Sequence, residues 1–263
     1  MIALNLICIL LYLVATLSVT TRWFHKEGPM VKVSLGAASV AVLLHLATLT
    51  HSVMTGNGQN LSIMNVGSIT ALLITSVILI LSLRNQQNFL LPLVTSFSAI
   101  MVLLANITPG SVIVHIELHP SLLAHISLAL LAYGCLSIAF LYALQLSFIN
   151  KKLKQKNSAI LHSSLPPLMQ VEQNLFRLIN LGTVLLTLSL ASGFFFLEDM
   201  FEQRQVHKTL LTTIAWFMYV SMIVLHKRKG LRDSTLISFT ITGVILLTLA
   251  YFGSRIVKEF FIG

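Results

Sequence analysis

Histidine is the side chain in this sequence whose type and position best fit chemistry inside a membrane. Of the nine histidines, His45 and His125 lie deepest within the long apolar segments. A polar side chain at that depth is costly, so it indicates either a functional group or a hydrogen-bonded packing residue. A neutral imidazole nitrogen is also a good ligand for haem iron, which binds one imidazole on each face. The pair therefore raises the hypothesis of a haem site with His45 and His125 as axial ligands.

The two histidines are expected at nearly the same depth. His45 lies 13 residues after Lys32, or about 20 Å from the inner face of an apolar core about 30 Å thick. His125 lies five residues after Pro120, or about 7 Å from the outer face. Each lies on a stripe of small residues, which favours helix–helix contact over lipid contact. The stripes are Ala38, Ala41, His45, Thr48 and Ser52, and Ser121, His125, Ala129 and Ala132.

Intramembrane histidines also have a simpler interpretation. Each could hydrogen-bond a Ser, a Thr or a backbone carbonyl of a neighbouring helix and bind no ligand. Both interpretations stay open from the residues alone. His115 and His119 are four residues apart but lie beside Pro120 in a polar connection, where solvated imidazoles are expected rather than a metal site.

The elements that would hold these histidines are transmembrane helices. Of the 263 residues, 56% are hydrophobic and only 10% are charged, whereas soluble domains carry roughly 25% charged residues. Apolar runs of about 20 residues are long enough to cross a bilayer. The sequence therefore predicts an all-α integral membrane protein, a single transmembrane domain over 1–263. The eight predicted spans are 2–21, 33–54, 62–83, 89–107, 121–149, 175–197, 208–226 and 235–254.

The basic residues predict the direction of the chain. There are 17 Lys and Arg against 8 Asp and Glu, a net charge of +9. Most of the basic residues lie in the connections after the first, third, fifth and seventh spans, and cytoplasmic connections collect Lys and Arg. We therefore expect both termini outside, on the periplasmic side. Since the charge is explained by membrane orientation, we expect the lipid bilayer, and no nucleic acid, as a partner.

Several reaction classes lack the residues they need. All eight acidic residues lie in connections, helix flanks or the C-terminal tail, so a proton- or sodium-coupled transporter would lack its buried carboxylate. No Walker A, GxSxG or HExxH string is present. Cys8 and Cys135 form neither a CxxC nor a CxxCH motif. The sequence therefore predicts a protein that is not an enzyme, and a small-molecule exporter is the least favoured alternative.

The second half of the chain carries strings that resemble a known family. They are HISLALLAYGCLSIAFLYALQL from His125, LPPLMQVEQNLFRLINLGTVLLTLSLASGFFF from Leu165 and WFMYVSMIVLHKRKGLRDS from Trp216, followed by TLAYFGSR. In this order, over about residues 120–257, they resemble the cytochrome c assembly proteins, a family of haem-handling membrane proteins. The resemblance implies an eight-helix, multi-pass protein of the bacterial inner membrane. It also implies binding or passing of haem, expected as haem b, within the helix bundle.

The same resemblance makes individual residues candidates for haem binding. His125 matches the family's outer-side histidine, and His226 matches an inner-end histidine that ligates a transmembrane haem in some members. His45 lies where related proteins place an early-helix histidine. Among the candidate haem ligands His125 ranks first, because the depth estimate and the family resemblance both select it. Arg255, at the outer end of the last span, is a candidate partner for a haem propionate, with an interfacial arginine as the alternative.

One departure from the family limits the expected activity. The assembly proteins present haem on a tryptophan-rich outer loop between spans six and seven, and this chain has EDMFEQRQVHK there. We therefore expect a protein that is not itself a complete cytochrome c haem ligase. The alternative is a structural or regulatory membrane subunit that keeps the fold without haem and acts through a membrane protein partner.

Overall fold

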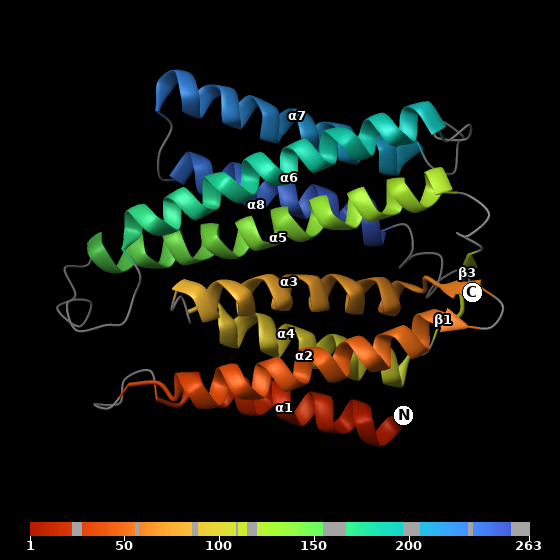
Figure 1. The fold of residues 1–263 in the computed structure, drawn as a ribbon. Helices are drawn as coiled ribbons and strands as arrows, with labels where there is room; N and C mark the ends of the chain where they lie inside the picture. The colour runs from red at the N-terminus through yellow and green to blue at the C-terminus, as the bar shows by residue number, and fades with distance from the viewer. Residues whose placement is uncertain are drawn as a thin grey trace. The chain divides into compact units, whose positions relative to one another are not determined.

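The computed structural model describes residues 1–22, 28–55, 58–85, 89–108, 110–114, 120–154, 167–196, 206–230 and 234–253. Within them it contains eight α-helices, which confirms the predicted number of helices (Figure 1). Seven of these helices are long and apolar enough to cross a membrane, and α4 is a shorter apolar helix. The helices are α1 (Ile2–Thr20), α2 (Val31–Val53), α3 (Ile63–Asn85), α4 (Leu91–Ile107), α5 (Pro120–Lys154), α6 (Leu168–Phe196), α7 (Val206–Lys229) and α8 (Ser234–Thr248).

Helix α6 begins earlier than the apolar pattern predicts. It starts at Leu168 rather than at residue 175, because Pro167 precedes it and its carbonyl oxygen accepts hydrogen bonds from the backbone of Gln170 and Val171. Proline is favoured at the start of a helix, because the backbone N–H groups of the first turn have no carbonyl partner within the helix and none is lost. At 29 residues, α6 is about 43 Å long. Its first turns therefore extend the helix beyond the hydrocarbon that the later turns cross.

Helix α7 ends at a glycine. Gly230 has a φ of 60°, and its N–H donates to the carbonyl of His226 at 2.9 Å. This left-handed conformation caps the last turn and is easy only for glycine. The cap leaves His226 in the last turn of α7.

Two kinds of element were not predicted. Helix α8 continues into a π-helical turn, η3 (Leu249–Gly253). Three short strands form an antiparallel sheet in the order β1-β2-β3: β1 (Met54–Thr55), β2 (Gly58–Asn60) and β3 (Ile113–Val114). The Asn60 side chain supports this sheet, because its amide donates to the Gly110 carbonyl and its oxygen accepts from the Ser62 and Val112 N–H groups. Such short strands leave no hydrophobic periodicity from which to predict them.

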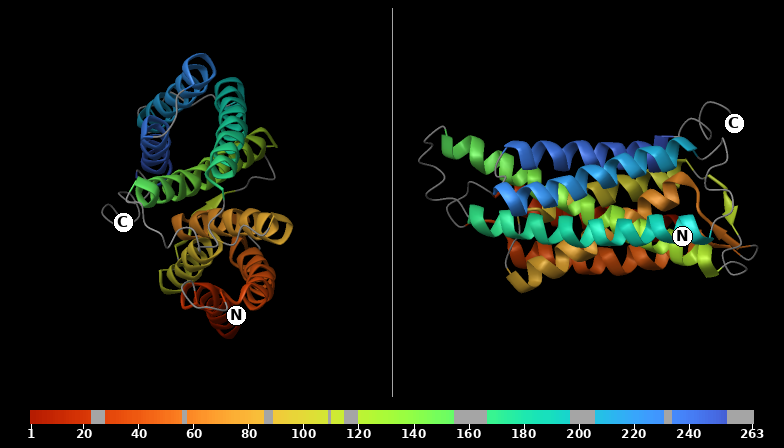
Figure 2. Two further views of the ribbon diagram at one scale, coloured as in Figure 1. Left: turned by 90° about the vertical axis from the view of Figure 1, so that its left-hand side faces the viewer. Right: turned by 90° about the horizontal axis from the view of Figure 1, so that it is seen from above.

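The helices group into two compact units. Helices α1–α4 form unit 1, and α5–α8 with η3 form unit 2 (Figure 2). In unit 1, α1 and α3 each pack against α2 and α4. In unit 2, α5 and α7 each pack against α6 and α8. Unit 2 contains the helices of the segment 120–257 that carries the family resemblance.

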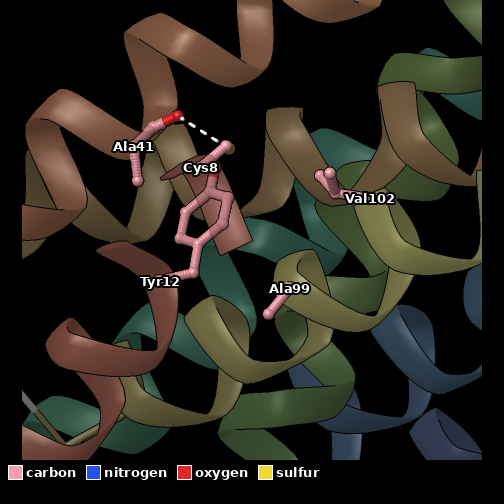
Figure 3. Packing of buried hydrophobic residues seen from close by; sticks show 5 residues of the cluster. All are labelled: Cys8, Tyr12, Ala41, Ala99 and Val102. Carbon is pink, nitrogen blue, oxygen red and sulfur yellow. Dashed lines mark hydrogen bonds between the residues drawn. The ribbon is translucent and has the colours of Figure 1, made fainter. Parts of the chain in front are cut away.

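The core between α1, α2 and α4 of unit 1 combines small side chains with one tyrosine ring. Cys8, Tyr12, Ala41, Ala99 and Val102 pack together and are buried (Figure 3). The Cys8 thiol donates to the carbonyl of Ala41 at 3.4 Å. Alanines at this contact let the helix backbones approach closely, which is how helices associate in a membrane.

Unit 2 contains two close approaches at glycine. A Cβ on Gly182 of α6 would lie 2.7 Å from Leu136 Cγ of α5, and one on Gly243 of α8 would lie 2.6 Å from the Tyr219 ring of α7. Any larger side chain would have to displace these neighbours. The two glycines therefore set how closely α5 meets α6 and how closely α7 meets α8.

Candidate functional site

His45 lies fully inside unit 1, and both of its ring nitrogens are hydrogen-bonded. Its Nδ1 atom is 3.1 Å from the hydroxyl of Tyr12, and its Nε2 atom is 2.8 Å from the hydroxyl of Ser68. The imidazole is 1% exposed. An iron ligand needs a ring nitrogen with a free lone pair, so His45 could bind iron only by giving up one of these two bonds.

These contacts belong to a hydrogen-bonded group that joins all four helices of unit 1. Tyr12 on α1 bonds His45 on α2 and also Ser98 on α4, while His45 bonds Ser68 on α3. Ser98 in turn lies 2.7 Å from the hydroxyl of Thr75 on α3. All five side chains are buried. The arrangement matches the packing interpretation of His45 as a satisfied core residue.

His125 has a different environment, on the face of α5 that meets α6 in unit 2. Its Nδ1 atom lies 3.0 Å from the backbone carbonyl oxygen of Ser189 and 3.1 Å from the hydroxyl of Ser192. The side chain is partly buried. Among the described residues, no hydrogen bond engages its Nε2 atom. The histidine therefore keeps one nitrogen for another partner.

The Ser189 carbonyl decides which nitrogen that is. A carbonyl oxygen only accepts, so a neutral imidazole must carry its hydrogen on Nδ1 to make this bond. The lone pair is then on Nε2. A metal-ligating histidine almost always donates its second nitrogen to a carbonyl or carboxylate in this way. The residues around His125 therefore fit the donor chemistry of an axial haem ligand.

His226 lines a cavity at the start of α6 and the end of α7. The cavity has a volume of about 550 Å³ and is lined by Leu168, Met169, Glu172, Gln173, Phe176, Arg177 and His226. The His226 ring stacks on Phe176 with ring centroids 3.6 Å apart and an angle of 27° between the planes. His226 therefore forms one wall of this cavity.

The contacts along α6 separate His125 from His226. His125 bonds Ser189 and His226 stacks on Phe176, and these α6 residues are 13 positions apart. At 1.5 Å per residue they differ in height by about 20 Å. Two imidazoles on one iron are far closer than that, so His125 and His226 cannot ligate the same iron.

The other predicted residues are not brought together. His45 belongs to unit 1 and His125 to unit 2, so their pairing stays a prediction. Arg255, His115 and His119 lie outside the described residues. Most positions of the small-residue stripes do face neighbouring helices, whereas Ser52 near the end of α2 is exposed. The buried members are Ala38, Ala41, His45 and Thr48 on α2, and Ala129 and Ala132 on α5.

The turn η3 takes part in a group of aromatic contacts that were not predicted. Tyr133 on α5 stacks on Tyr251, with centroids 5.3 Å apart, and contacts Phe252 at 5.9 Å. The Tyr133 hydroxyl also lies 2.9 Å from that of Thr248. Tyr251 and Phe252 of this π-helical turn therefore both contact Tyr133 of α5, and π-helical turns are frequent at functional sites.

The partners of the two histidines were also missed. Ser189 and Ser192 are three residues apart in an apolar run, a spacing that puts them on one helix face. That pattern was a usable signal for a polar contact. For Tyr12 and Ser68 the sequence gives polar neighbours at helical spacing, Thr16 and Asn65, but nothing that points to His45.

Comparison with known proteins identifies the family of this chain. The family profile described as cytochrome C assembly protein matches residues 33–262. The chain belongs to the cytochrome c assembly protein family. It is 37% identical over 256 residues to the inner membrane protein YpjD of Escherichia coli (strain K12), covering 97% of both chains. It is also 28% identical over 141 residues to an uncharacterized 28.8 kDa protein of Azospirillum brasilense, covering 53% of this chain and 52% of that protein. No solved structure matches the chain.

Proposed function

We propose that this protein is a multi-pass protein of the bacterial inner membrane that binds or passes haem b within its helices, with His125 as an iron ligand. Membership of the cytochrome c assembly family supports the class of function, and the name of the Escherichia coli relative supports the location. The observation that carries the haem proposal is the bond between His125 Nδ1 and the Ser189 carbonyl. It leaves Nε2 as the nitrogen suited to iron.

The chain's own residues would hold the ligand in three ways. Ser189 and Ser192 orient the His125 ring and fix its tautomer. His45 is a candidate second ligand, which requires that it release Tyr12 or Ser68. Arg255 is a candidate partner for a propionate, because a guanidinium binds carboxylates in a forked geometry. When bound, haem supplies an iron atom that accepts axial imidazoles.

The proposed function is non-enzymatic and stops short of attaching haem to cytochrome c. The connection between α6 and α7, residues 197–205, contains no tryptophan. The chain thus has no tryptophan-rich loop at the place where the family resemblance locates haem presentation. We therefore propose that another protein would complete the transfer.

An absorption spectrum of the detergent-purified protein, from haem-replete cells and after added haem, tests the proposal. The wild type should show a low-spin haem spectrum, and His125→Ala should lower the haem content by about tenfold or more. His51→Ala is the matched control, because His51 is exposed at the end of α2 and should keep the haem. Wild-type protein that stays colourless in both preparations would overturn the proposal.

The environment of His45 favours a second candidate function, that of a structural or regulatory membrane subunit. His45, Tyr12 and Ser68 satisfy one another and tie helices of unit 1 together without a ligand. Under this alternative, a membrane protein should co-purify with the chain in stoichiometric amount. His45→Ala and His125→Ala should then both preserve that complex, whereas a haem protein should lose its cofactor with His125→Ala.

A further inference from the structure

The cavity beside His226 carries one acidic and one basic side chain. Glu172 and Arg177 both line it, together with the stacked rings of Phe176 and His226. Among the described residues, neither Glu172 nor Arg177 makes an ion pair or a hydrogen bond with another side chain. The cavity therefore offers a carboxylate and a guanidinium that protein neighbours leave available to a ligand.

The two charges have a defined order along α6. Glu172 lies in the second turn of the helix, and Arg177 lies five residues further in, or about 7.5 Å along the axis. The end of α7 beside them carries the exposed Lys227 and Arg228, which marks this level as a membrane–water interface. From water towards hydrocarbon, a ligand therefore meets the carboxylate first and the guanidinium second.

An apolar track continues from Arg177 along the same face of α6. Leu181, Val184 and Leu188 follow Arg177 at spacings of four, three and four residues, which keeps them on one side of the helix. Each is at least half exposed: Leu181 52%, Val184 57% and Leu188 50%. Below the two charges the helix thus presents a surface suited to an acyl chain.

We propose that this cavity binds a zwitterionic phospholipid whose headgroup carries a phosphate and a terminal primary ammonium. The ammonium would pair with Glu172, the phosphate with Arg177, and an acyl chain would follow Leu181, Val184 and Leu188. The order of groups in such a lipid, from water inwards, is ammonium, phosphate and acyl chain. It matches the order of the side chains, and it stands independently of haem binding at His125.

The carboxylate distinguishes this ligand from purely anionic ones. A headgroup such as phosphatidylglycerol would satisfy Arg177 but leave Glu172 unpaired beside a negative charge. Haem propionates would meet the same repulsion. Specificity often comes from such an element that disfavours the wrong partner. A choline headgroup could not donate hydrogen bonds to Glu172 and should bind less well than the primary ammonium.

The test is competitive lipid binding to the full-length purified protein. The protein is delipidated and then reconstituted into nanodiscs made of equal amounts of phosphatidylethanolamine, phosphatidylglycerol and phosphatidylcholine with identical acyl chains. The lipid molecules that stay bound to the protein are counted by native mass spectrometry. The wild type should prefer phosphatidylethanolamine by about threefold to fivefold, the effect of exposed ion pairs. Glu172→Gln should remove the preference over phosphatidylglycerol, and Arg177→Gln should weaken retention of both lipids.

Two further variants separate a built site from general surface charge. Arg228→Gln removes an exposed arginine next to the cavity that does not line it, and should leave the preference unchanged. Exchanging the charges, Glu172→Arg with Arg177→Glu, keeps the net charge but reverses the order, and should abolish the preference. Equal retention of all three lipids by the wild type would overturn the proposal. So would a loss with Arg228→Gln as large as that with Arg177→Gln, or haem displacing the lipid from this cavity.

Discussion

The Nδ1 atom of His125 lies 3.0 Å from the backbone carbonyl oxygen of Ser189. This contact joins α5 to α6 and holds the imidazole in one tautomer, because a carbonyl can only accept a hydrogen bond. In unit 1, His45 instead bonds the hydroxyls of Tyr12 and Ser68, which can donate or accept at either nitrogen. The two histidines that look alike in the sequence therefore differ in what they leave available to a ligand.

Removing the second partner of His125 should weaken haem binding without abolishing it. Ser192→Ala deletes a hydroxyl 3.1 Å from Nδ1 but leaves the Ser189 carbonyl in place. Haem titration followed by absorbance should show an affinity lower by about tenfold at most. Ser221→Ala, which removes an exposed hydroxyl bonded within its own helix, is the control. An affinity loss as large as that of His125→Ala would show that the carbonyl does not orient the ring.

Loss of the Tyr12 hydroxyl should destabilise unit 1. Tyr12→Phe keeps the ring but leaves His45 Nδ1 without its partner, and interhelical hydrogen bonds in membranes contribute about 0.6 kcal/mol on average and up to about 1.7. The free energy of unfolding in mixed micelles should fall by about that amount. Thr50→Val, on an exposed site whose bonds lie within α2, should change it little. A neutral Tyr12→Phe would argue against a packing role for this group.

The contact between α7 and α8 should not accept a methyl group. Gly243→Ala would place a Cβ 2.6 Å from the ring of Tyr219, which is 1% exposed and cannot move aside. Overpacking of this kind costs about 1 to 3 kcal/mol, so the midpoint of thermal unfolding in detergent should drop. Gly134→Ala in α5 meets nothing within 4 Å and serves as the control. Equal behaviour of the two variants would contradict the close approach.

The contact between α5 and α6 allows a stricter test with two changes. Gly182→Ala would bring a Cβ to 2.7 Å from Leu136 Cγ and should destabilise unit 2. Leu136→Ala alone should also destabilise it, by about 2 to 5 kcal/mol, because Leu136 is fully buried. In the double variant the new methyl enters the space that the leucine leaves. Unfolding measurements should therefore give a combined loss smaller than the sum, and strict additivity would count against the contact.

The short sheet β1-β2-β3 of unit 1 should depend on one asparagine. Asn60→Ala removes the bonds to the Gly110 carbonyl and to the Ser62 and Val112 N–H groups. Hydrogen exchange at the backbone of residues 58–62 and 110–114 should become faster, because exchange reports local opening. Asn180→Ala, whose amide bonds only within α6, should leave those rates unchanged. Unaltered protection in Asn60→Ala would show that the strand pairing alone holds the sheet together.

The helices could be predicted closely because a bilayer demands long apolar runs. The start of α1 and the end of α4 agree with the spans predicted from hydropathy. The largest error, at the start of α6, arose because its first turns are amphipathic and carry Glu172 and Arg177. An apolar window misses turns that lie at an interface, whereas Pro167 marked the true start.

For the candidate site residues, the sequence predicted which helix face each one lies on, but not which side chain of another helix it contacts. Small-residue spacing correctly placed His45 and Ala129 against other helices. Small-residue spacing could not show that Tyr12 hydrogen-bonds His45, because the two residues are 33 positions apart and neither helix sequence identifies its contact in the other. The expectation that His125 lies toward the outer side and His226 at the inner end already set the two apart, and the contacts along α6 add a separation of about 20 Å.

By itself the amino-acid sequence determined the membrane class, the eight helices and the identity of the histidines worth testing. Composition and periodicity depend only on neighbours along the chain, and the hydrophobic requirement of the bilayer acts on each segment alone. Only the tertiary structure decided which nitrogen of His125 is left for a ligand, why His45 has none to spare, and that Glu172 and Arg177 share a cavity. Those properties arise from side chains of different helices meeting within hydrogen-bonding distance, and no single segment encodes such a meeting.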